Sequence, residues 1–555
     1  MKHEYSVDVL IVGGSLGAVA AAISCGRLGV RTLLVSPDNW LGGQATSQGV
    51  PPDEHPWIEY TGSTSTYREF RARIRSTYRA LPRVDSRWTL EPRLNPGAGL
   101  VSPITHDPRV SVQVIEGLLL QYRMDGTLGI LRGYEPVAAE TEGDFVRTVD
   151  FGEFAVWAKQ VVDATETGEL LPLAGVEYVV GTEGLGEFDE PHGAEVADPM
   201  NQQAISWCAG LRWDEKCGRK AGVGEYEPIP KPAEYEYWKK QVAPFWPGPQ
   251  LSFACIDPFS GAATEASLLG GGRPGTERVG GLWAYRRIHR PDLFTPSCNP
   301  AIDVTLVNWP QIDYWEAPVI DGPDVELQLR RAKGLTLSFI HWLQTEAPRD
   351  NGGIGYPEIR LYGSLFETTH GLARDVYIRE SRRIRAQYTI TENDIGVGAR
   401  TALGDDRAAD FPDSVGLASY RIDLHPSTGG DSYIDIESYP AQIPLASLIP
   451  ERVNNLLAGC KNIGATHLAS GMYRVHPAEW NIGEAAGALA AEAVRQKTVP
   501  RVISADPDRR EAFQLLLHDR LGFELEWPPH IRTVSRWVPQ LQWTIKEKRS
   551  GWHLA

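Results

Sequence analysis

Several features that would place a protein in a distinctive class are missing from this 555-residue chain. Its six cysteines form no C-x-x-C pair, which argues against a metal site and a dithiol relay, so we expect reduced structural thiols and a cytoplasmic protein. No apolar run reaches the roughly 20 residues that span a bilayer. The chain also has no excess of basic residues, since its formal net charge is -16. This charge argues against binding to a nucleic-acid backbone.

The remaining composition is that of a globular protein. A chain of 555 residues exceeds the size of a single core, so we expect two or three domains. The first residues resemble a secretion signal in part, but Glu4 and Asp8 precede the apolar stretch where such a signal carries basic residues. We therefore expect this stretch to belong to the fold.

A strand, a turn of small residues and a helix follow one another at the N-terminus. Val9–Val12 is apolar and rich in β-branched residues, as buried parallel strands are. The turn Gly13-Gly14-Ser15-Leu16-Gly17-Ala18 leads into an alanine-rich helix that ends at Gly29, and Val30–Val35 predicts a second strand. Small residues let the helix N-terminus present N–H groups to a pyrophosphate. The segment therefore predicts a βαβ unit that binds a dinucleotide.

This segment departs from the G-x-G-x-x-G pattern at two points. Ser15 takes the place of the second glycine, while Ala18 at the third position is permitted. The acidic residue expected after the second strand is missing, since Ser36 stands there and Asp38 comes two residues later. Either side chain could bond a ribose hydroxyl.

The next stretch, Trp40-Leu41-Gly42-Gly43-Gln44-Ala45-Thr46-Ser47-Gln48, carries a family resemblance. Together with the N-terminal unit it resembles the FAD-dependent oxidoreductases of the glutathione-reductase-like fold, and in particular a bacterial group known only by that general description. The resemblance implies FAD as the cofactor. It also implies that Gly42 and Gly43 allow close approach of the backbone to the flavin ring system. The alternative for these glycines is a plain turn.

Further segments follow in the order of this fold. Asp107-Pro108 predicts the start of a helix over Arg109–Tyr122. The alternating runs Leu128–Arg132, Pro136–Glu140, Val146–Val149 and Glu153–Trp157 predict an antiparallel meander. Gln160–Asp163 predicts another buried strand, followed by a turn with Ala164 and Thr165. The resemblance implies that this turn closes the first half of an FAD-binding domain.

We therefore predict an α/β fold with a Rossmann-type FAD-binding domain, a β-meander and an inserted α+β substrate domain. The predicted boundaries are 1–190 and 377–500 for the FAD-binding domain, 195–375 for the substrate domain and 501–555 for a C-terminal helical tail. The substrate domain is rich in tryptophan, and Asp324–Glu346 has helical spacing. These tryptophans either fill a core or face a flat substrate such as an aromatic or sugar ring. The tail is expected to pack on the FAD-binding domain or on a second subunit of a homo-oligomer.

The last part of the FAD-binding domain holds a polar segment between a strand and a helix. Asn455–Cys460 predicts the strand, and Glu479–Val494 predicts the alanine-rich helix. The resemblance implies that the helix N-terminus points at the flavin, where its dipole would stabilise negative charge. An apparent strand, Ala386–Thr391, precedes this region. The charged segment 377–384 before it is either a solvated or salt-bridged connection or an anion site.

Candidate site residues come from these segments. A base near neutral pH is best supplied by histidine, and an arginine can anchor a carboxylate. Each histidine could instead order a loop, and the Pro51–Trp57 segment could be a surface loop. The catalytic candidates are His467, His476, Glu479, Arg474 and His55. The cofactor-binding candidates are Gly13, Gly14, Ser15, Gly17, Ala18, Ser36, Pro37, Gly42, Gly43, Gln44, Thr46, Ser47, Ala164, Thr165, Gly459, Asn462, Asn481 and Ile482.

Absent motifs narrow the chemistry further. No second glycine fingerprint for NAD(P)H is present, and Gly459-Cys460-Lys461-Asn462 replaces the Gly-Asp pair of aromatic hydroxylases. The leading hypothesis is an oxidase or dehydrogenase that takes hydride from a CH–OH, CH–NH or CH–CH bond of a small molecule. Oxygen or another acceptor then reoxidises the flavin. Two alternatives stay open, a redox-neutral isomerase or lyase and a non-catalytic flavin-binding protein.

Overall fold

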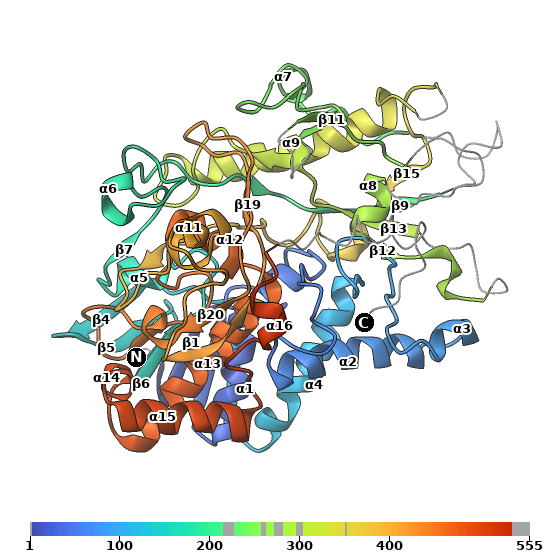
Figure 1. Cartoon of the computed structure of the whole chain (residues 1–555). Coiled ribbons are helices and arrows are strands. Elements are labelled where there is room, and N and C mark those ends of the chain that lie inside the picture. Colours follow the sequence, from blue (N-terminus) through green and yellow to red (C-terminus); the bar gives the residue numbers. More distant parts are fainter. Residues whose placement is uncertain are drawn as a thin grey trace.

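The computed structural model describes residues 3–214, 227–256, 262–270, 281–295, 303–349 and 352–535. Cys217, Cys298 and the tail beyond Ser535 lie outside the described residues. The chain forms two lobes, one around a large sheet and one that contains the long helix α9 (Val325–Thr345) (Figure 1). Because residues from both ends of the sequence build the sheet lobe, the second lobe is an insertion in it.

A seven-stranded sheet lies at the centre of the first lobe, in the order β3-β2-β1-β6-β5-β4, with β21 also paired to β6. Its strands are β1 (His3–Val12), β2 (Thr32–Ser36), β3 (Leu128–Arg132), β4 (Ala138–Glu142), β5 (Phe145–Asp150), β6 (Phe154–Asp163) and β21 (Leu456–Ala458). Strands β3, β2, β1, β6 and β21 are parallel, while β4 and β5 are antiparallel. The predicted Rossmann-type α/β fold is therefore confirmed.

Three strand predictions were wrong in detail. Leu128–Arg132 is β3, which pairs in parallel with β2 and is not part of the meander. The predicted strands Glu153–Trp157 and Gln160–Asp163 are one strand, β6, because the alternation of buried and exposed residues continues through Ala158 and Lys159 without a turn. Ala386–Thr391 makes only isolated bridges, at Ala386 and Ile390, and forms no strand.

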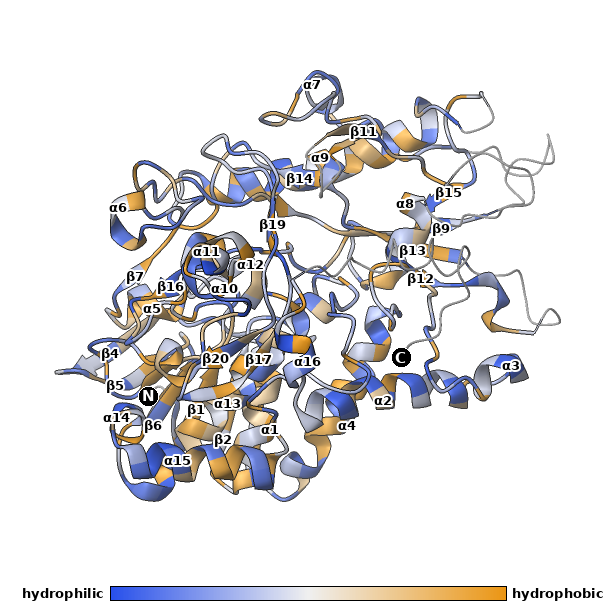
Figure 2. Ribbon diagram, viewed as in Figure 1, coloured by the Kyte–Doolittle hydropathy of each residue, from blue (hydrophilic) through white to orange (hydrophobic). Residues whose placement is uncertain are grey.

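Helices α1 (Leu16–Leu28) and α13 (His476–Gln496) cross in direct backbone contact. Ser15 caps α1 by accepting a hydrogen bond from the Ala18 amide, and the helix ends at Gly29 in a left-handed conformation. A Cβ atom added to Gly483 of α13 would lie 2.1 Å from the carbonyl oxygen of Gly17. Figure 2 shows the apolar character of α1, α13 and the central strands. The small residues predicted in both helices thus serve to bring their N-termini together.

The helices predicted elsewhere in this lobe are present. Asp107 caps α4 (Pro108–Met124) as expected, and α4 packs beside α2 (Ser65–Ala80). The predicted helix Pro507–Leu521 is α15 (Pro507–Leu515), continued by a π-helical turn, Leu516–Leu521. The other helices of this lobe are α3 (Ser86–Thr89), α5 (Leu170–Leu173), α6 (Leu185–Phe188), α10 (Glu392–Ile395), α11 (Val397–Ala402), α12 (His467–Tyr473), α14 (Pro500–Ala505) and α16 (Pro529–Arg532). The small paired strands are β7 (Tyr178–Val179) with β16 (Arg383–Ile384), β17 (Ser414–Ala418) with β20 (Ala441–Pro444), and β18 (Ile422–Leu424) with β19 (Ile434–Ile436).

The second lobe consists of an antiparallel sheet and α9. The sheet has the order β12-β13-β9-β15, and the ends of α9 are close to those predicted from its spacing. Trp238, Trp283 and Trp309 are fully buried, so these tryptophans fill the core of this lobe and do not face a substrate. The strands and short helices here are β8 (Ile205–Ser206), β9 (Ala209–Trp213), β10 (Ala254–Ile256), β11 (Ala263–Glu265), β12 (Arg287–His289), β13 (Asp303–Val307), β14 (Asp313–Tyr314), β15 (Ile359–Leu361), α7 (Tyr235–Trp238) and α8 (Leu282–Tyr285). Among the helices described in either lobe, none has the length and apolarity needed to cross a membrane.

Gly483→Ala should destabilise the protein, because its methyl group would be forced against the backbone of Gly17. Overpacking of this kind costs about 1–3 kcal/mol of unfolding free energy, which urea denaturation followed by tryptophan fluorescence would measure. Gly398→Ala in α11 is the matched control, because an added Cβ there meets no atom within 4 Å. Equal stabilities of the two variants would show that the α1–α13 contact tolerates separation.

Candidate functional site

The predicted cofactor segments meet at the carboxyl ends of the parallel strands. Gly13 has a φ of +111°, and an added Cβ there would lie 2.2 Å from the carbonyl oxygen of Ala164. A Cβ on Gly17 would lie 2.0 Å from the carbonyl oxygen of Gly459. Ser15 donates its hydroxyl to the Ala164 carbonyl. The turn after β1, the turn after β6 and the segment after β21 are therefore packed together around the N-terminus of α1.

The predicted flavin loop joins this group. The amides of Gly42 and Gly43 both donate to the carbonyl of Gly14. The hydroxyls of Thr46 and Ser47 donate to the carbonyl of Gly43, and these bonds hold the loop in its conformation. A Cβ on Gly43 would lie 2.0 Å from Glu166 Oε1, so the loop backbone closely approaches the end of β6.

The end of β2 holds the two candidates for the ribose contact. Ser36 is buried against Gly14 and donates its hydroxyl to the carbonyl of Asp38, while Pro37 is exposed. The Asp38 carboxylate pairs with Arg374 at 2.8 Å. On the β21 side of this edge, the Asn462 side chain donates to the Asp163 carbonyl. The residues Asn481 and Ile482 are buried in α13, where the Asn481 amide bonds to the β17 backbone.

A dinucleotide fits the chemistry of this edge. Buried polar atoms without a hydrogen-bond partner among the described residues lie here, namely Gln48 Oε1 and Asp163 Oδ2, and the Gln48 amide lies beside the Glu166 carboxylate. Carboxylate oxygens of this kind can accept hydroxyl groups of a ribose or ribityl chain, while the N-terminus of α1 favours a phosphate. Burial raises the pKa of Asp163 to about 7. Residues 13–18, 42–48, 163–166 and 459–462 would therefore hold FAD.

A buried lysine lies between two carboxylates beside this edge. Lys461 contacts Glu166, and its Nζ lies 3.6 Å from Glu479 Oε2. Glu479 also accepts the Gly17 amide at 3.2 Å and contacts the Gln44 amide. Burial opposes the charge of Lys461, but Glu166 and Glu479 outweigh it and raise the pKa of the lysine. Glu479, predicted as a catalytic candidate, thus lies on the cofactor side, and Glu166 and Lys461 were not predicted at all.

His467 belongs to a buried ion network. Its Nδ1 lies 3.1 Å from Glu380 Oε2, and Glu380 also pairs with Arg383 at 2.6 Å. Burial opposes protonation of the ring, but Glu380 outweighs it and raises the pKa of His467. The His467 amide donates to Glu183 at the start of α12, so this network anchors that helix.

His476 and His55 both bind backbone groups. His476 Nδ1 accepts the Asp53 amide at 3.1 Å, and its Nε2 lies 3.0 Å from the Val50 carbonyl, so neither ring nitrogen is spare. Burial lowers the pKa of His476 to about 3, which keeps the ring neutral. His55 Nε2 lies 3.1 Å from the Gly62 carbonyl, and its ring packs edge-on against Trp527. Both rings order the segment after the flavin loop.

That segment is not a surface loop. Residues 50–55 are buried throughout, and Asp53 forms an ion pair with Arg286 at 3.1 Å. The neighbouring Glu54 binds Arg71 at 2.9 Å and the hydroxyl of Tyr67. The segment therefore connects the flavin loop to the second lobe through Asp53, and to α2 through Glu54.

Charged and phenolic side chains gather where the two lobes meet α12 and α13. The central polar cluster consists of Asp53, Tyr285, Arg286, Asp313, Tyr377, Arg379, Tyr420, Asp423, His425, Tyr433 and Arg474. Asp53, Tyr377 and Tyr420 lie within electrostatic reach of both Arg286 and Arg474. Tyr285, Tyr420, Asp423, His425 and Tyr433 are only partly buried, so the cluster is not fully sealed from solvent. Of the predicted catalytic residues, Arg474 is a member.

His425, which the sequence patterns did not indicate, is the accessible histidine of this cluster. Its Nδ1 contacts Asp313 Oδ2 at 2.5 Å, and Asp313 Oδ1 accepts bonds from Ser206 and from Arg379 at 3.0 Å. The His425 side chain is 14% exposed, whereas that of His467 is 6% exposed. Burial and then Arg379 lower its pKa, while Asp313 acts in the opposite direction. The contact with Asp313 orients the ring so that Nε2 is directed away from Asp313 and lies 3.8 Å from Asp423 Oδ2.

The charged segment 377–384 is buried and salt-bridged. Arg379 holds Asp313, and Arg383 binds Glu183 and Glu380 with no exposed side-chain surface of its own. A solvated connection is therefore ruled out. Arg379 places one end of this segment in the central polar cluster.

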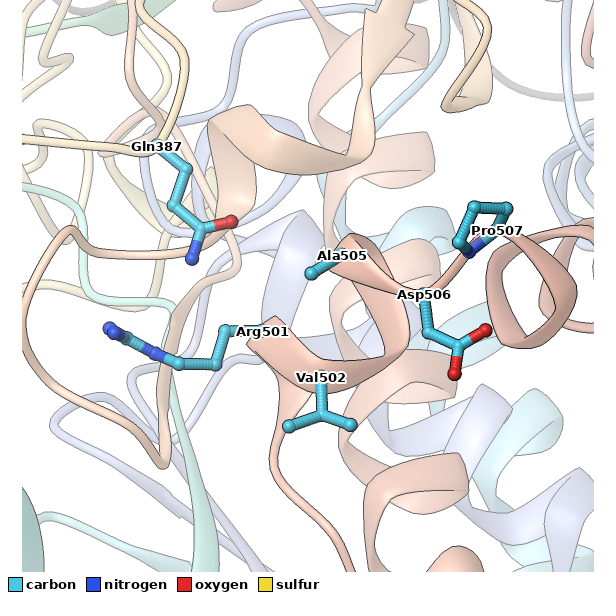
Figure 3. A pocket seen from close by; sticks show the side chains of 6 residues that line it. All are labelled: Gln387, Arg501, Val502, Ala505, Asp506 and Pro507. Atoms are coloured by element: carbon cyan, nitrogen blue, oxygen red, sulfur yellow. The ribbon is translucent and has the colours of Figure 1, made fainter.

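A surface hollow of about 660 Å³ lies beside α14, and none of these residues lines it (Figure 3). It is lined by Gln387, Arg501, Val502, Ala505, Asp506 and Pro507. Arg501 Nη2 donates to the carbonyls of residues 450–453, while its Nε has no hydrogen-bond partner among the described residues. In the part of the chain that the structure describes, no group of three acidic, histidine or cysteine residues is arranged to hold a metal ion.

A family model covers most of the chain. The family model described as "FAD dependent oxidoreductase" matches residues 8–515. No curated protein matches the chain. An L-proline dehydrogenase from P. horikoshii is 16% identical over 33% of this chain, with a TM-score of 0.18, and the match spans only 24% of that protein.

Two further solved structures are similar to the chain. A geranylgeranyl bacteriochlorophyll reductase-like protein from Thermoplasma acidophilum is 10% identical, covering 94% of this chain and 85% of that one, with a TM-score of 0.30. A glycerol-3-phosphate dehydrogenase from Bacillus halodurans, complexed with FAD, is 13% identical over 38% of this chain and 41% of that one, with a TM-score of 0.23. At these identities the likeness concerns the fold.

Replacing His467 and His476 by glutamine should give opposite dependences of stability on pH. The raised pKa of His467 means that stabilisation by its charged ring is complete below about pH 6.5 and is lost as the pH rises through the folded pKa. The lowered pKa of His476 means that stabilisation by its neutral ring is complete above about pH 6.5 and is lost as the pH falls toward 3. The wild-type minus variant difference in unfolding free energy, measured in urea, should fall with rising pH for His467→Gln and rise for His476→Gln. Slopes of the same sign would contradict these assignments.

Lys461→Met should leave Glu166 and Glu479 without their shared cation. Breaking a buried ion cluster in this way costs about 3–5 kcal/mol of stability, and the uncompensated carboxylates should also weaken binding of the negatively charged cofactor. Both effects can be followed by urea denaturation and by the quenching of FAD fluorescence on reconstitution. The double variant Lys461→Met/Glu166→Gln removes one carboxylate charge and should recover part of both losses. Unchanged FAD affinity in Lys461→Met would place the lysine outside the cofactor site.

Proposed function

Because the chain belongs to the FAD dependent oxidoreductase family, we propose that it oxidises a small organic molecule bound in the central polar cluster. Its cofactor is FAD, held at the carboxyl ends of β1, β6 and β21. The bond oxidised is of the CH–OH, CH–NH or CH–CH type, and oxygen or another acceptor regenerates the cofactor. Membership of an oxidoreductase family argues against a flavin-binding protein without catalysis.

The observation that carries this proposal is the position of the central polar cluster. Asp53 follows the flavin loop directly, and Arg474 immediately precedes the N-terminal turn of α13, whose Glu479 contacts α1. The cluster thus begins where the cofactor-binding segments end, and because some of its members are only partly buried it is not fully sealed from solvent. Bound FAD supplies an acceptor for a hydride ion from the substrate.

His425 is the residue best placed to take a proton from the substrate. The contact with Asp313 fixes the proton of the ring on Nδ1, which leaves Nε2 as the acceptor. Because its pKa is lowered, the ring is neutral at pH 7 and can act as a general base. By contrast, both nitrogens of His476 are engaged by the backbone, and the neighbouring Glu380 raises the pKa of His467, which makes that ring harder to use as a base.

His425→Gln should slow flavin reduction while FAD stays bound. Removal of a general base typically costs a factor of about 10²–10⁴ in rate, to be measured by anaerobic bleaching of the flavin with alcohols, amines, sugars and aromatic metabolites. The wild-type rate should fall as the pH drops below about 6.5 and the ring becomes protonated. The rate of the variant should show no such fall. His370→Gln, which alters a half-buried histidine beside Trp207, is the control.

Two other results would redirect the assignment. Bleaching of wild type and His425→Gln at the same rate would exclude His425 as the base. Conversion of a substrate into an isomer or elimination product, with flavin oxidised before and after, would favour the redox-neutral alternative.

A further inference from the structure

In the part of the chain that the structure describes, three buried arginines of the central polar cluster retain an unused Nε–H donor, namely Arg286, Arg379 and Arg474. Arg379 is held tightly by Asp313, whereas Arg286 and Arg474 form looser pairs. Arg474 is 4% and Arg286 is 8% exposed, and the Nε–H group of each has no hydrogen-bond partner among the described residues. Arg474 uses Nη2 for the carbonyl and carboxylate of Asp423, at 2.8 and 3.1 Å. Its Nη1 lies 3.5 Å from the Tyr377 hydroxyl, which is the outer limit of a hydrogen bond. Neither guanidinium has therefore used its full capacity in the pairs that it forms.

The ion pair between Arg286 and Asp53 also has long distances. Arg286 Nη1 and Nη2 lie 3.1 and 3.5 Å from the two carboxylate oxygens of Asp53, a geometry weaker than a tight bidentate pair. A buried donor without a partner costs free energy, so such donors are expected where a ligand completes them. An anionic acceptor group satisfies two guanidinium donors at once, and the two oxygens of a carboxylate match their planar fork.

The same site holds one unused acceptor. Asp423 Oδ1 receives no well-aligned hydrogen bond from the described residues, although the Tyr433 hydroxyl lies beside this carboxylate, and Asp423 Oδ2 lies 3.8 Å from Nε2 of His425. The spare oxygen and the free ring nitrogen both accept hydrogen bonds. A ligand that meets them must carry an O–H or N–H group. Because Asp423 is also the partner of Arg474, this donor must lie close to the group that Arg474 binds.

We propose that the central polar cluster binds a carboxylate that carries a hydroxyl or amino group on the neighbouring carbon. Arg286 and Arg474 hold the carboxylate, and Asp423 and His425 receive the adjacent O–H or N–H group. This inference rests on the proposed function, since it names the substrate class of the same site. It selects CH–OH or CH–NH, and not CH–CH, as the bond next to the base.

Binding of small probes to the FAD-loaded protein tests the inference without turnover. The probes are mandelate, phenylglycine, phenylacetate and mandelamide, and the readouts are the shift of the flavin absorbance spectrum and the thermal unfolding midpoint. Mandelate or phenylglycine should bind at least tenfold more tightly than mandelamide, which lacks the charge, and than phenylacetate, which lacks the donor. The mandelate and phenylglycine arms distinguish a hydroxy acid from an amino acid.

Substitutions of the cluster side chains test which of them contact the probe. Arg474→Lys, which keeps the charge but loses the planar fork, should raise the Kd at least tenfold. Arg286→Met is combined with Asp53→Asn, so that no buried charge is left unpaired, and should have a similar effect. Asp423→Asn should reduce the preference for mandelate over phenylacetate to less than about twofold. Arg349→Met, which alters an arginine paired with Glu358 in the second lobe, is the control and should leave the Kd unchanged.

Two results of the binding measurements would overturn the inference. One is equal affinity for mandelate and mandelamide in the wild type. The other is unchanged affinity in both arginine variants while FAD remains bound. Flavin bleaching by an uncharged alcohol or amine would also overturn it, while leaving the proposed function intact. Charge-dependent binding without any bleaching would instead support the site and count against the proposed oxidation.

Discussion

The backbone contact between α1 and α13 is the constraint on which the rest of the structure depends. Gly17 and Gly483 allow the two helices to touch, with Gly487 repeating the contact one turn further along. Because of this contact, the N-termini of both helices lie at the same edge of the sheet. The dipoles of two helices are then directed at one region, which favours a ligand with negative charge at two places. A larger residue at either contact would separate them and open the cofactor site.

The two charged regions beside this edge are built differently. On the cofactor side, one lysine lies between two carboxylates, and the hydrogen bond from Gly17 to Glu479 joins it to α1. In the central polar cluster, each arginine is paired with an aspartate but retains a donor. The first arrangement compensates charge within the protein, whereas the second leaves hydrogen-bond donors available to a ligand. Burial makes both arrangements sensitive to the loss of one partner.

Much of the fold could be predicted because its signals are local. The small-residue turn after β1, the Asp107 cap of α4 and the spacing of α9 each depend on residues close together in the sequence. The errors occurred where distant pairing decides the outcome. β3 has the pattern of a meander strand but pairs with β2, and Ala386–Thr391 has the pattern of a strand but finds no neighbouring strand in the sheet.

By itself, the sequence determined the class of fold, the small-residue turn after β1 and the two small-residue helices, because propensity, capping and periodicity act over a few residues. Only the tertiary structure decided which polar side chains meet. His425 and Asp313 are 112 residues apart, Arg286 and Asp53 are 233 apart, and Lys461 and Glu166 are 295 apart. Whether a histidine acts as a base or orders a loop depends on such partners and on burial, since these set its pKa and its free nitrogen. No local pattern distinguishes His425 from His476, and the difference arises only when the lobes are packed together.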